Sequence, residues 1–269
     1  EDIRVLQKLM GLDKPHHERY LFWLLGAVQG DLGISMWTRT PVMEEIWKAL
    51  PVSLELTILS TVLSVIIAIP AGFISAVRQN TWMDYGSRLA SIWGLAIPHF
   101  WLATLLLFYP SVMFGYNPPV VYIPFFDDPL HNLEQFALPA FSMGVYYTAI
   151  VMRMTRSCML EVLRQDYIRT AWSKGLREGT ILIRHAFKNA SIPVITLVGF
   201  EFGRVLAGTI VIETVFTLPG LGRLTFDAIG WRDYTQLSGN LLTIAAIFLI
   251  VNLLVDLLYG VLDPRIRYQ

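Results

Sequence analysis

Five long apolar runs limit this chain to folds that cross a lipid bilayer. The hydrocarbon layer is about 30 Å thick and a helix rises about 1.5 Å per residue, so about 20 apolar residues span it. The five runs are residues 52–77, 89–113, 136–154, 192–215 and 237–262. Of all 269 residues, 54% are hydrophobic and 16% are charged, whereas an ordinary soluble domain is about 25% charged. The sequence therefore predicts an all-α integral membrane protein with five spanning helices.

Lys and Arg gather in the connections that we predict to be cytoplasmic, since short basic loops stay on that side of the membrane. The connection between the third and fourth runs, with its flanks, holds eight basic and three acidic residues. Arg78 and Arg88 bracket the first turn, whereas residues 116–135 contain neither Lys nor Arg. This distribution places the C-terminus in the cytoplasm and residues 1–51 outside.

The predicted outer segment, residues 1–51, is charged and shows no signal peptide. Translocation of such a segment needs a hydrophobic element before it, so we expect a further span upstream and six in the full protein. Within the segment, residues 3–10 and 20–28 are predicted to form short amphipathic helices, separated by a turn at 11–15.

The basic connection contains a short amphipathic helix with a glycine stop. Its apolar face consists of Tyr167, Ile168, Ala171 and Trp172, and its polar face of Arg169, Thr170, Ser173 and Lys174. Gly175 can adopt the left-handed conformation that ends a helix. A second amphipathic helix is predicted over 181–189, and Pro193 is predicted to open the next span. An interfacial anchor on anionic headgroups is the alternative interpretation, although an anchor needs no glycine between its helices.

The stretch Asp166-Tyr-Ile-Arg-Thr-Ala-Trp-Ser-Lys-Gly-Leu176 resembles the EAA loop of ABC importer permeases, in the form found in the dipeptide/oligopeptide/nickel group. Arg169 and Thr170 stand where the general pattern has Glu and Ala. The resemblance covers nearly the whole chain. It extends to residues 30–35, 50–57, 97–102, 184–193, 213–224 and 251–268.

The resemblance implies a type I importer permease with a coupling helix that is seated in a groove of an ATPase subunit. Movement of that subunit would tilt the helix and switch the permease between its inward-open and outward-open states. The implied coupling residues are Asp166, Tyr167, Ile168, Arg169, Thr170, Ala171, Trp172, Lys174, Gly175 and Leu176. It also implies a second homologous permease, two cytoplasmic ATPase subunits that carry ATP and Mg²⁺, and a binding protein that docks outside near 217–224. The location would be the cytoplasmic membrane of a bacterium or archaeon.

Two domains are expected on this basis. Residues 1–51 would form the outer segment, and residues 52–269 the transmembrane permease domain with a cytoplasmic coupling loop at about 155–191. No cofactor or metal is expected on this chain, and the single cysteine, Cys158, excludes an intramolecular disulfide.

Three ionisable residues within the apolar runs are candidates for the transport pathway. Glu201 and Arg204 are three residues apart, so they can meet on one helix face, and charges in spans usually face protein or water. They could meet the charged ends of a peptide, or form an internal ion pair beside the close-packing glycines Gly199 and Gly203. His99 is either a pathway residue or a partner for carbonyls freed by Pro98.

Enzymatic motifs are missing from the sequence. It contains no G-x-x-x-x-G-K-[ST], G-x-S-x-G or H-E-x-x-H pattern, so ATP hydrolysis is expected on separate chains. An intramembrane enzyme would need converging catalytic groups, and a secondary transporter commonly shows an internal repeat; neither is evident. The substrate expected from the resemblance is a di- or oligopeptide, with nickel chelates, glutathione and sugars as alternatives.

Overall fold

A computed structural model describes residues 15–119 and 121–262 of the chain. Within them the regular structure is helical. The helices are α2 (His16–Val28), α3 (Val42–Val77), α4 (Trp82–Ala96), α5 (His99–Phe114), α6 (Pro129–Leu163), α7 (Asp166–Ser173), α8 (Glu178–Thr180), the π-helix η1 (Ile181–Phe187), α9 (Lys188–Val215), α10 (Leu221–Trp231) and α11 (Tyr234–Leu262). The predicted helix over 20–28 lies within α2, and the one over 3–10 falls outside the described residues.

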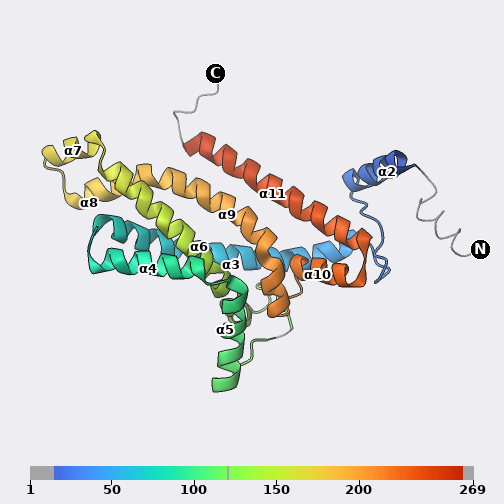
Figure 1. Ribbon diagram of the computed structural model, residues 1–269. Coiled ribbons are helices and arrows are strands. Elements are labelled where there is room, and N and C mark those ends of the chain that lie inside the picture. The colour runs from blue at the N-terminus through green and yellow to red at the C-terminus, as the bar shows by residue number, and fades with distance from the viewer. Residues whose placement is uncertain (1–14, 120, 263–269) are drawn as a thin grey trace, which may run out of the picture.

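Among the described residues, four helices are long and apolar enough to cross a membrane, and a bent pair brings the number to five if it counts as one span. The four contain the predicted runs 52–77, 136–154, 192–215 and 237–262. Figure 1 shows α7, α8 and the α3–α4 turn at one end of the bundle, and α2 and α10 at the other. The basic connections therefore share one end, as the charge distribution predicted.

The predicted run over 89–113 is bent rather than straight. The segment forms α4 and α5, which meet at an angle of 93°. Proline has no N–H and disfavours the helical conformation of the residue before it. Ile97, just before Pro98, accordingly has an extended backbone with φ −84° and ψ 119°.

Two further predicted boundaries differ from the structure. Helix α3 begins at Val42, ten residues before the predicted span, so it crosses the expected division between residues 51 and 52. The predicted outer loop between the last two spans contains a helix, α10, of 11 residues. Its amphipathic sequence is too short to register as a span, which is why hydropathy missed it.

In the part of the chain that the structure describes, three clusters of buried apolar side chains are arranged along the bundle. The cluster at the α7 end joins α3, α6, α7, η1 and α9 and contains Met159 and Ile181. A middle cluster is centred on Leu56, Phe136 and Ile212. The third, at the α2 end, contains Ile46 and Leu221. Many apolar side chains outside these clusters are exposed in the single chain, as expected of a protein whose surface faces lipid and other subunits.

Candidate functional site: the α7 loop and the outer end

Helix α7 ends in a Schellman motif, as the glycine in its sequence predicted. Gly175 has a positive φ of 71°. Its N–H donates to the Trp172 carbonyl at 2.9 Å, and the N–H of Leu176 donates to the Ala171 carbonyl at 3.4 Å. This pair of bonds satisfies the last carbonyls of the helix and reverses the chain. These backbone hydrogen bonds thereby set the direction in which the chain leaves α7.

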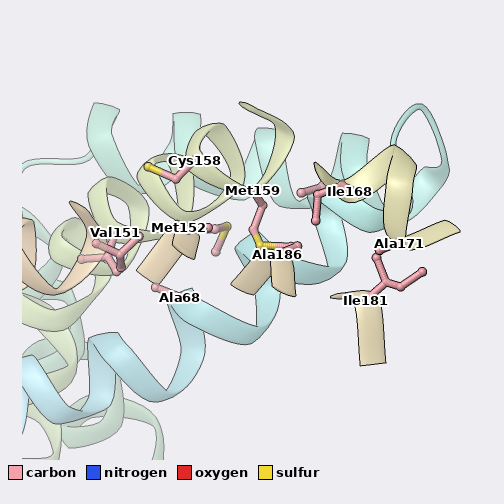
Figure 2. Close-up of a cluster of buried hydrophobic side chains, with 12 residues drawn as sticks. Ala68, Val151, Met152, Cys158, Met159, Ile168, Ala171, Ile181 and Ala186 are labelled. Carbon is pink, nitrogen blue, oxygen red and sulfur yellow. The ribbon is translucent and has the colours of Figure 1, made fainter. Parts of the chain in front are cut away.

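One side of α7 is anchored in the core of this chain. Ile168 is 1% exposed and Ala171 is 7% exposed, and both belong to the cluster that contains Met159 and Ile181. Figure 2 shows Ile168 and Ala171 beside Ile181, Ala186 and Met159. Helix α7 is therefore anchored to η1 and to the buried cluster that also contains side chains of α6 and α9.

The other large apolar side chains of α7 are not buried with them. Tyr167 is 43% exposed, Trp172 is 47% exposed, and Leu176 just after the helix is 39% exposed. The sequence predicted one apolar face of four residues, but the structure divides it. Ile168 and Ala171 pack inside the chain, whereas Tyr167 and Trp172 present apolar surface to the outside.

The polar residues of α7 are exposed and bonded mainly to their own helix. Arg169 pairs with Asp166 at 3.4 Å. The Thr170 hydroxyl donates to the Asp166 carbonyl and the Ser173 hydroxyl to the Arg169 carbonyl, each at 3.0 Å, and Lys174 is exposed. These contacts support the helix and leave its outer surface free for a partner.

The predicted second helix of the loop is not separate from the next span. Residues 178–215 form one helical run of 38 residues, in which η1 is followed directly by α9. Pro193 lies inside α9, so the prediction that it opens the span was wrong. The run is continuous from the loop after α7 into α9. Asn189, near the start of α9, donates to the Tyr167 hydroxyl at 2.9 Å and so joins the two helices.

A buried carboxylate organises the opposite end of the bundle. Glu213 of α9 is fully buried and accepts hydrogen bonds from the Ser53 hydroxyl of α3 at 2.6 Å and from the Arg223 N–H at 2.9 Å. The Leu221 N–H donates to Ser53 at 2.7 Å. The first N–H groups of a helix lack partners within it and favour negative charge, so Glu213 and Ser53 together cap α10 and join three helices. Glu213 lies in the stretch 213–224 that resembles the permease family, but its spacing alone indicated no role for it.

A hollow of about 560 Å³ lies beside this cap, between the start of α3 and α10. It is lined by Glu45, Lys48, Arg223, Asp227 and Trp231, among others. Its lining thus carries charges of both signs, and Trp231 is stacked on Trp37 with 5.5 Å between the ring centroids.

Residues 68–268 match the family model of the binding-protein-dependent transport system inner membrane component. The chain belongs to this family. The dipeptide transport system permease protein DppB of Alkalihalophilus pseudofirmus is 40% identical over 98% of this chain and 85% of the relative. DppB of Escherichia coli K12 is 40% identical over 97% of this chain and 84% of the relative, and a putative peptide transport system permease of Brucella abortus is 40% identical over the whole chain and 86% of the relative.

Two solved structures confirm the fold of this permease. An amino acid ABC transporter with histidines matches with a TM-score of 0.60 at 16% identity, over 83% of this chain and 94% of the other. The MetNI methionine ABC transporter in an inward-facing conformation matches with a TM-score of 0.64 at 15% identity, over 82% and 97%. The chain is therefore a multi-pass membrane protein with the type I importer fold, and its homologues are transport subunits.

The predicted pair Glu201–Arg204 forms in this permease. Arg204 donates to Glu201 at 3.0 Å; the Glu201 side chain is 7% exposed and that of Arg204 is 58% exposed. The second Glu201 oxygen, Oε2, is buried and has no partner among the described residues. Side chains added at Gly199 and Gly203 would collide with Val255 and Phe248 of α11, so these glycines do permit close helix approach.

The third predicted pathway residue, His99, begins α5 and is half-buried. Its ring lies edge-on to Phe100. Within the described residues its ring makes no hydrogen bond, and none joins it to Glu201 or Arg204. The structure thus brings two of the three predicted pathway residues together.

A buried ion pair that the sequence analysis missed fixes the α7 end. Arg156 of α6 donates through Nε and Nη2 to the two oxygens of Asp84 in α4, at 2.7 and 3.0 Å. The Ser75 hydroxyl of α3 donates to the same carboxylate at 2.7 Å. The Asp84 side chain has no exposed surface. Three helices are held together here, beside the cluster that anchors α7.

We predict that Asp84→Ala destabilises the permease by about 3 kcal/mol, because it leaves Arg156 largely buried without its partner. The double variant Asp84→Leu/Arg156→Met should recover most of the loss, since apolar groups can replace a buried ion pair. Thermal unfolding in detergent, run as a double-mutant cycle with Asp84→Leu alone and Arg156→Met alone, measures the coupling. Strictly additive losses would show that the pair contributes nothing beyond its two members.

Proposed function

We propose that this chain is one of two permease subunits of an ATP-driven, binding-protein-dependent importer of dipeptides and oligopeptides. The observation that carries the proposal is 40% identity, over nearly the whole chain, to dipeptide permeases from two different organisms. The exposed aromatic side chains of α7, Tyr167 and Trp172, lie at one end of the bundle. This surface supports the ATP-driven part of the proposal, because it could contact an ATPase subunit.

In the proposed mechanism α7 is the coupling helix. Tyr167, Trp172 and Leu176 fill a groove of the ATPase subunit, while Ile168 and Ala171 hold α7 to the core. Large, half-exposed aromatic residues are the usual anchors of protein interfaces. The polar residues Asp166, Arg169, Thr170 and Lys174 surround this contact, and the Schellman turn at Gly175 sets its angle. Rotation of the ATPase subunits would then tilt α6 and α9 as rigid levers.

The remaining subunits follow from the same proposal. ATP and Mg²⁺ bind to two separate cytoplasmic subunits, and this chain carries no catalytic activity of its own. A homologous second permease completes the pathway. The α7 end and the C-terminus face the cytoplasm, and the outer segment 1–51 and the hollow lined by Glu45, Lys48, Arg223 and Asp227 face the binding protein. The proposed permease domain is 52–269, and the first ten residues of α3, from Val42, extend into the outer segment.

Glu201 and Arg204 are proposed to line the pathway. The Arg204 side chain is exposed in the single chain, and Glu201 has one oxygen without a partner in the described residues. A cation and an anion at this site match the carboxylate and ammonium ends of a peptide. His99, at the bend between α4 and α5, is proposed as a third lining residue.

Reconstitution tests this function. The permease, its partner permease, the ATPase subunits and the binding protein are placed in liposomes, and ATP-dependent uptake of a labelled dipeptide is measured. We expect uptake to require both ATP and the binding protein. Uptake of a nickel chelate, glutathione or a sugar in place of the dipeptide would overturn the substrate class alone. Uptake without ATPase subunits would overturn the ABC mechanism.

A further inference from the structure

A cleft between α4 and α6 has features of a ligand site that transport does not require. It has a volume of about 240 Å³. It is lined by Ser75, Ser87, Arg88, Ser91, Ile92, Leu95, Met152, Arg153 and Arg156. Three arginines in so small a cleft are costly near a hydrocarbon layer unless something neutralises them.

The charge of the cleft is only partly neutralised by the chain itself. Asp84 engages Nε and Nη2 of Arg156, and among the described residues the remaining terminal nitrogen, Nη1, donates to nothing. Arg153 is exposed and makes no ion pair or hydrogen bond with any part of the chain that the structure describes. Arg88 lies over the Tyr85 ring, 5.7 Å from its centroid, without a carboxylate partner there. An anion would therefore complete the cleft.

The lining changes from polar to apolar along the cleft. On α4 it passes from Ser87 and Arg88, near the turn that follows α3, to Ile92 and Leu95 nearer the middle of the bundle. Helix α6 runs toward α7, so its lining passes in the opposite order along the chain, from the apolar Met152 to the charged Arg156. The charged end thus lies at the membrane surface on the α7 side, and the apolar end points into the hydrocarbon region.

This polarity is that of an amphiphile lying along the bilayer normal. Trp82, at the surface end of α4, is 78% exposed, and tryptophan at a helix end is typical of the headgroup level. Basic pockets between spanning helices on the cytoplasmic side are suited to anionic lipid headgroups. A free phosphate would use the arginines but would leave the apolar half of the cleft unused.

From the cleft's geometry we propose that Arg88, Arg153 and Arg156 bind the phosphodiester headgroup of an anionic phospholipid, whose acyl chain lies along Ile92 and Leu95. The lipid would bridge α4 and α6 next to the Asp84–Arg156 pair. The site is independent of the transported substrate, so it stands or falls separately from the proposed function.

The test uses the full transporter complex, purified in mild detergent and mixed with phosphatidylglycerol and phosphatidylcholine. Native mass spectrometry counts the lipids retained by the wild type and by Arg88→Gln/Arg153→Gln. The wild type should retain phosphatidylglycerol preferentially, and the double variant should bind it roughly 30-fold more weakly, as expected for two lost basic contacts at a lipid surface. The matched control is Arg177→Gln/Arg184→Gln, which removes two exposed charges from the same end of the chain and should leave phosphatidylglycerol retention unchanged.

Both side chains of the test variant are exposed, so its folding should be intact, and co-purification of the ATPase subunits verifies this. Unchanged phosphatidylglycerol retention in Arg88→Gln/Arg153→Gln overturns the proposal, as does an equal loss in the control. Competition distinguishes the source of the phosphate. Inorganic phosphate or sn-glycerol 3-phosphate should fail to displace the lipid at millimolar concentration, and displacement would assign the cleft to a free anion instead.

Discussion

Trp172→Asp should leave the permease folded in the membrane but without its ATPase subunits and without transport. Trp172 is 47% exposed and lies outside the core cluster that holds α7, so its removal costs the isolated chain little. In the proposed interface it is a central aromatic anchor, and truncation of such residues commonly costs about 2 kcal/mol or more, roughly 30-fold in affinity. A buried aspartate in its place adds a desolvation cost.

Co-purification of the ATPase subunits and ATP-dependent uptake are the two measurements. Ser173→Asp is the matched control for charge, since it adds the same carboxylate one residue away on the exposed polar side of α7 and should reduce coupling far less. Ile168→Ala is the control for folding: its side chain is 1% exposed, so truncation should cost about 2 to 5 kcal/mol of stability. Normal uptake by Trp172→Asp would exclude this face of α7 from the coupling contact.

Hydropathy and charge were sufficient to predict the class, four of the spans and the basic end of the bundle. They do not give the 93° bend within 89–113, because a window average cannot distinguish a straight helix from two helices that meet at Pro98. The backbone preference of the residue before a proline indicates a break at Pro98, but it does not set the angle between the two helices. Helix α10 was missed for a related reason, since it is short and lies between two stronger signals.

For α7, the helix and its C-terminal turn could be predicted from the sequence, but the contacts of its side chains with other helices could not. The helix, its end and the left-handed Gly175 follow from a sequence of 11 residues. The division of the apolar face does not, because whether Ile168 or Trp172 is buried depends on where η1 and α6 pass. Asp84–Arg156 and Glu213–Ser53 escaped notice because 72 and 160 residues separate their members, and no local spacing rule reaches so far.

Substitution of a glycine beside the Glu213 cap is expected to cause a second large loss of stability. A Cβ at Gly222 would lie 2.6 Å from the Ile210 Cα and 2.7 Å from its nitrogen. Both atoms are backbone of α9, which cannot move aside as a flexible side chain can. At Gly220 the added atom would collide with the carboxyl group of Glu213. The cap therefore depends on the close approach of the α10 N-terminus to α9.

We expect Gly222→Ala to destabilise the permease by about 3 kcal/mol, the upper part of the usual range for overpacking, and to lower its thermal midpoint by roughly 6 to 12 °C. Gly208→Ala in α9 is the matched control. A Cβ there meets only the Tyr147 hydroxyl at 3.7 Å and Met143 at 4.0 Å, and alanine is favoured over glycine in a helix by about 1 kcal/mol. The two substitutions add the same methyl group within 15 residues of each other and should act in opposite directions.

Thermal unfolding of both variants in detergent, followed by tryptophan fluorescence, measures the difference. The loss in Gly222→Ala should come from separation of α10 from α9, so it should be accompanied by loss of the Glu213 cap. If so, Glu213→Ala should add little to the destabilisation in the Gly222→Ala background, although it should be costly on its own because Ser53 and the Arg223 N–H lose their acceptor. Equal stability of Gly222→Ala and Gly208→Ala would mean that α10 is not docked on α9 by this contact.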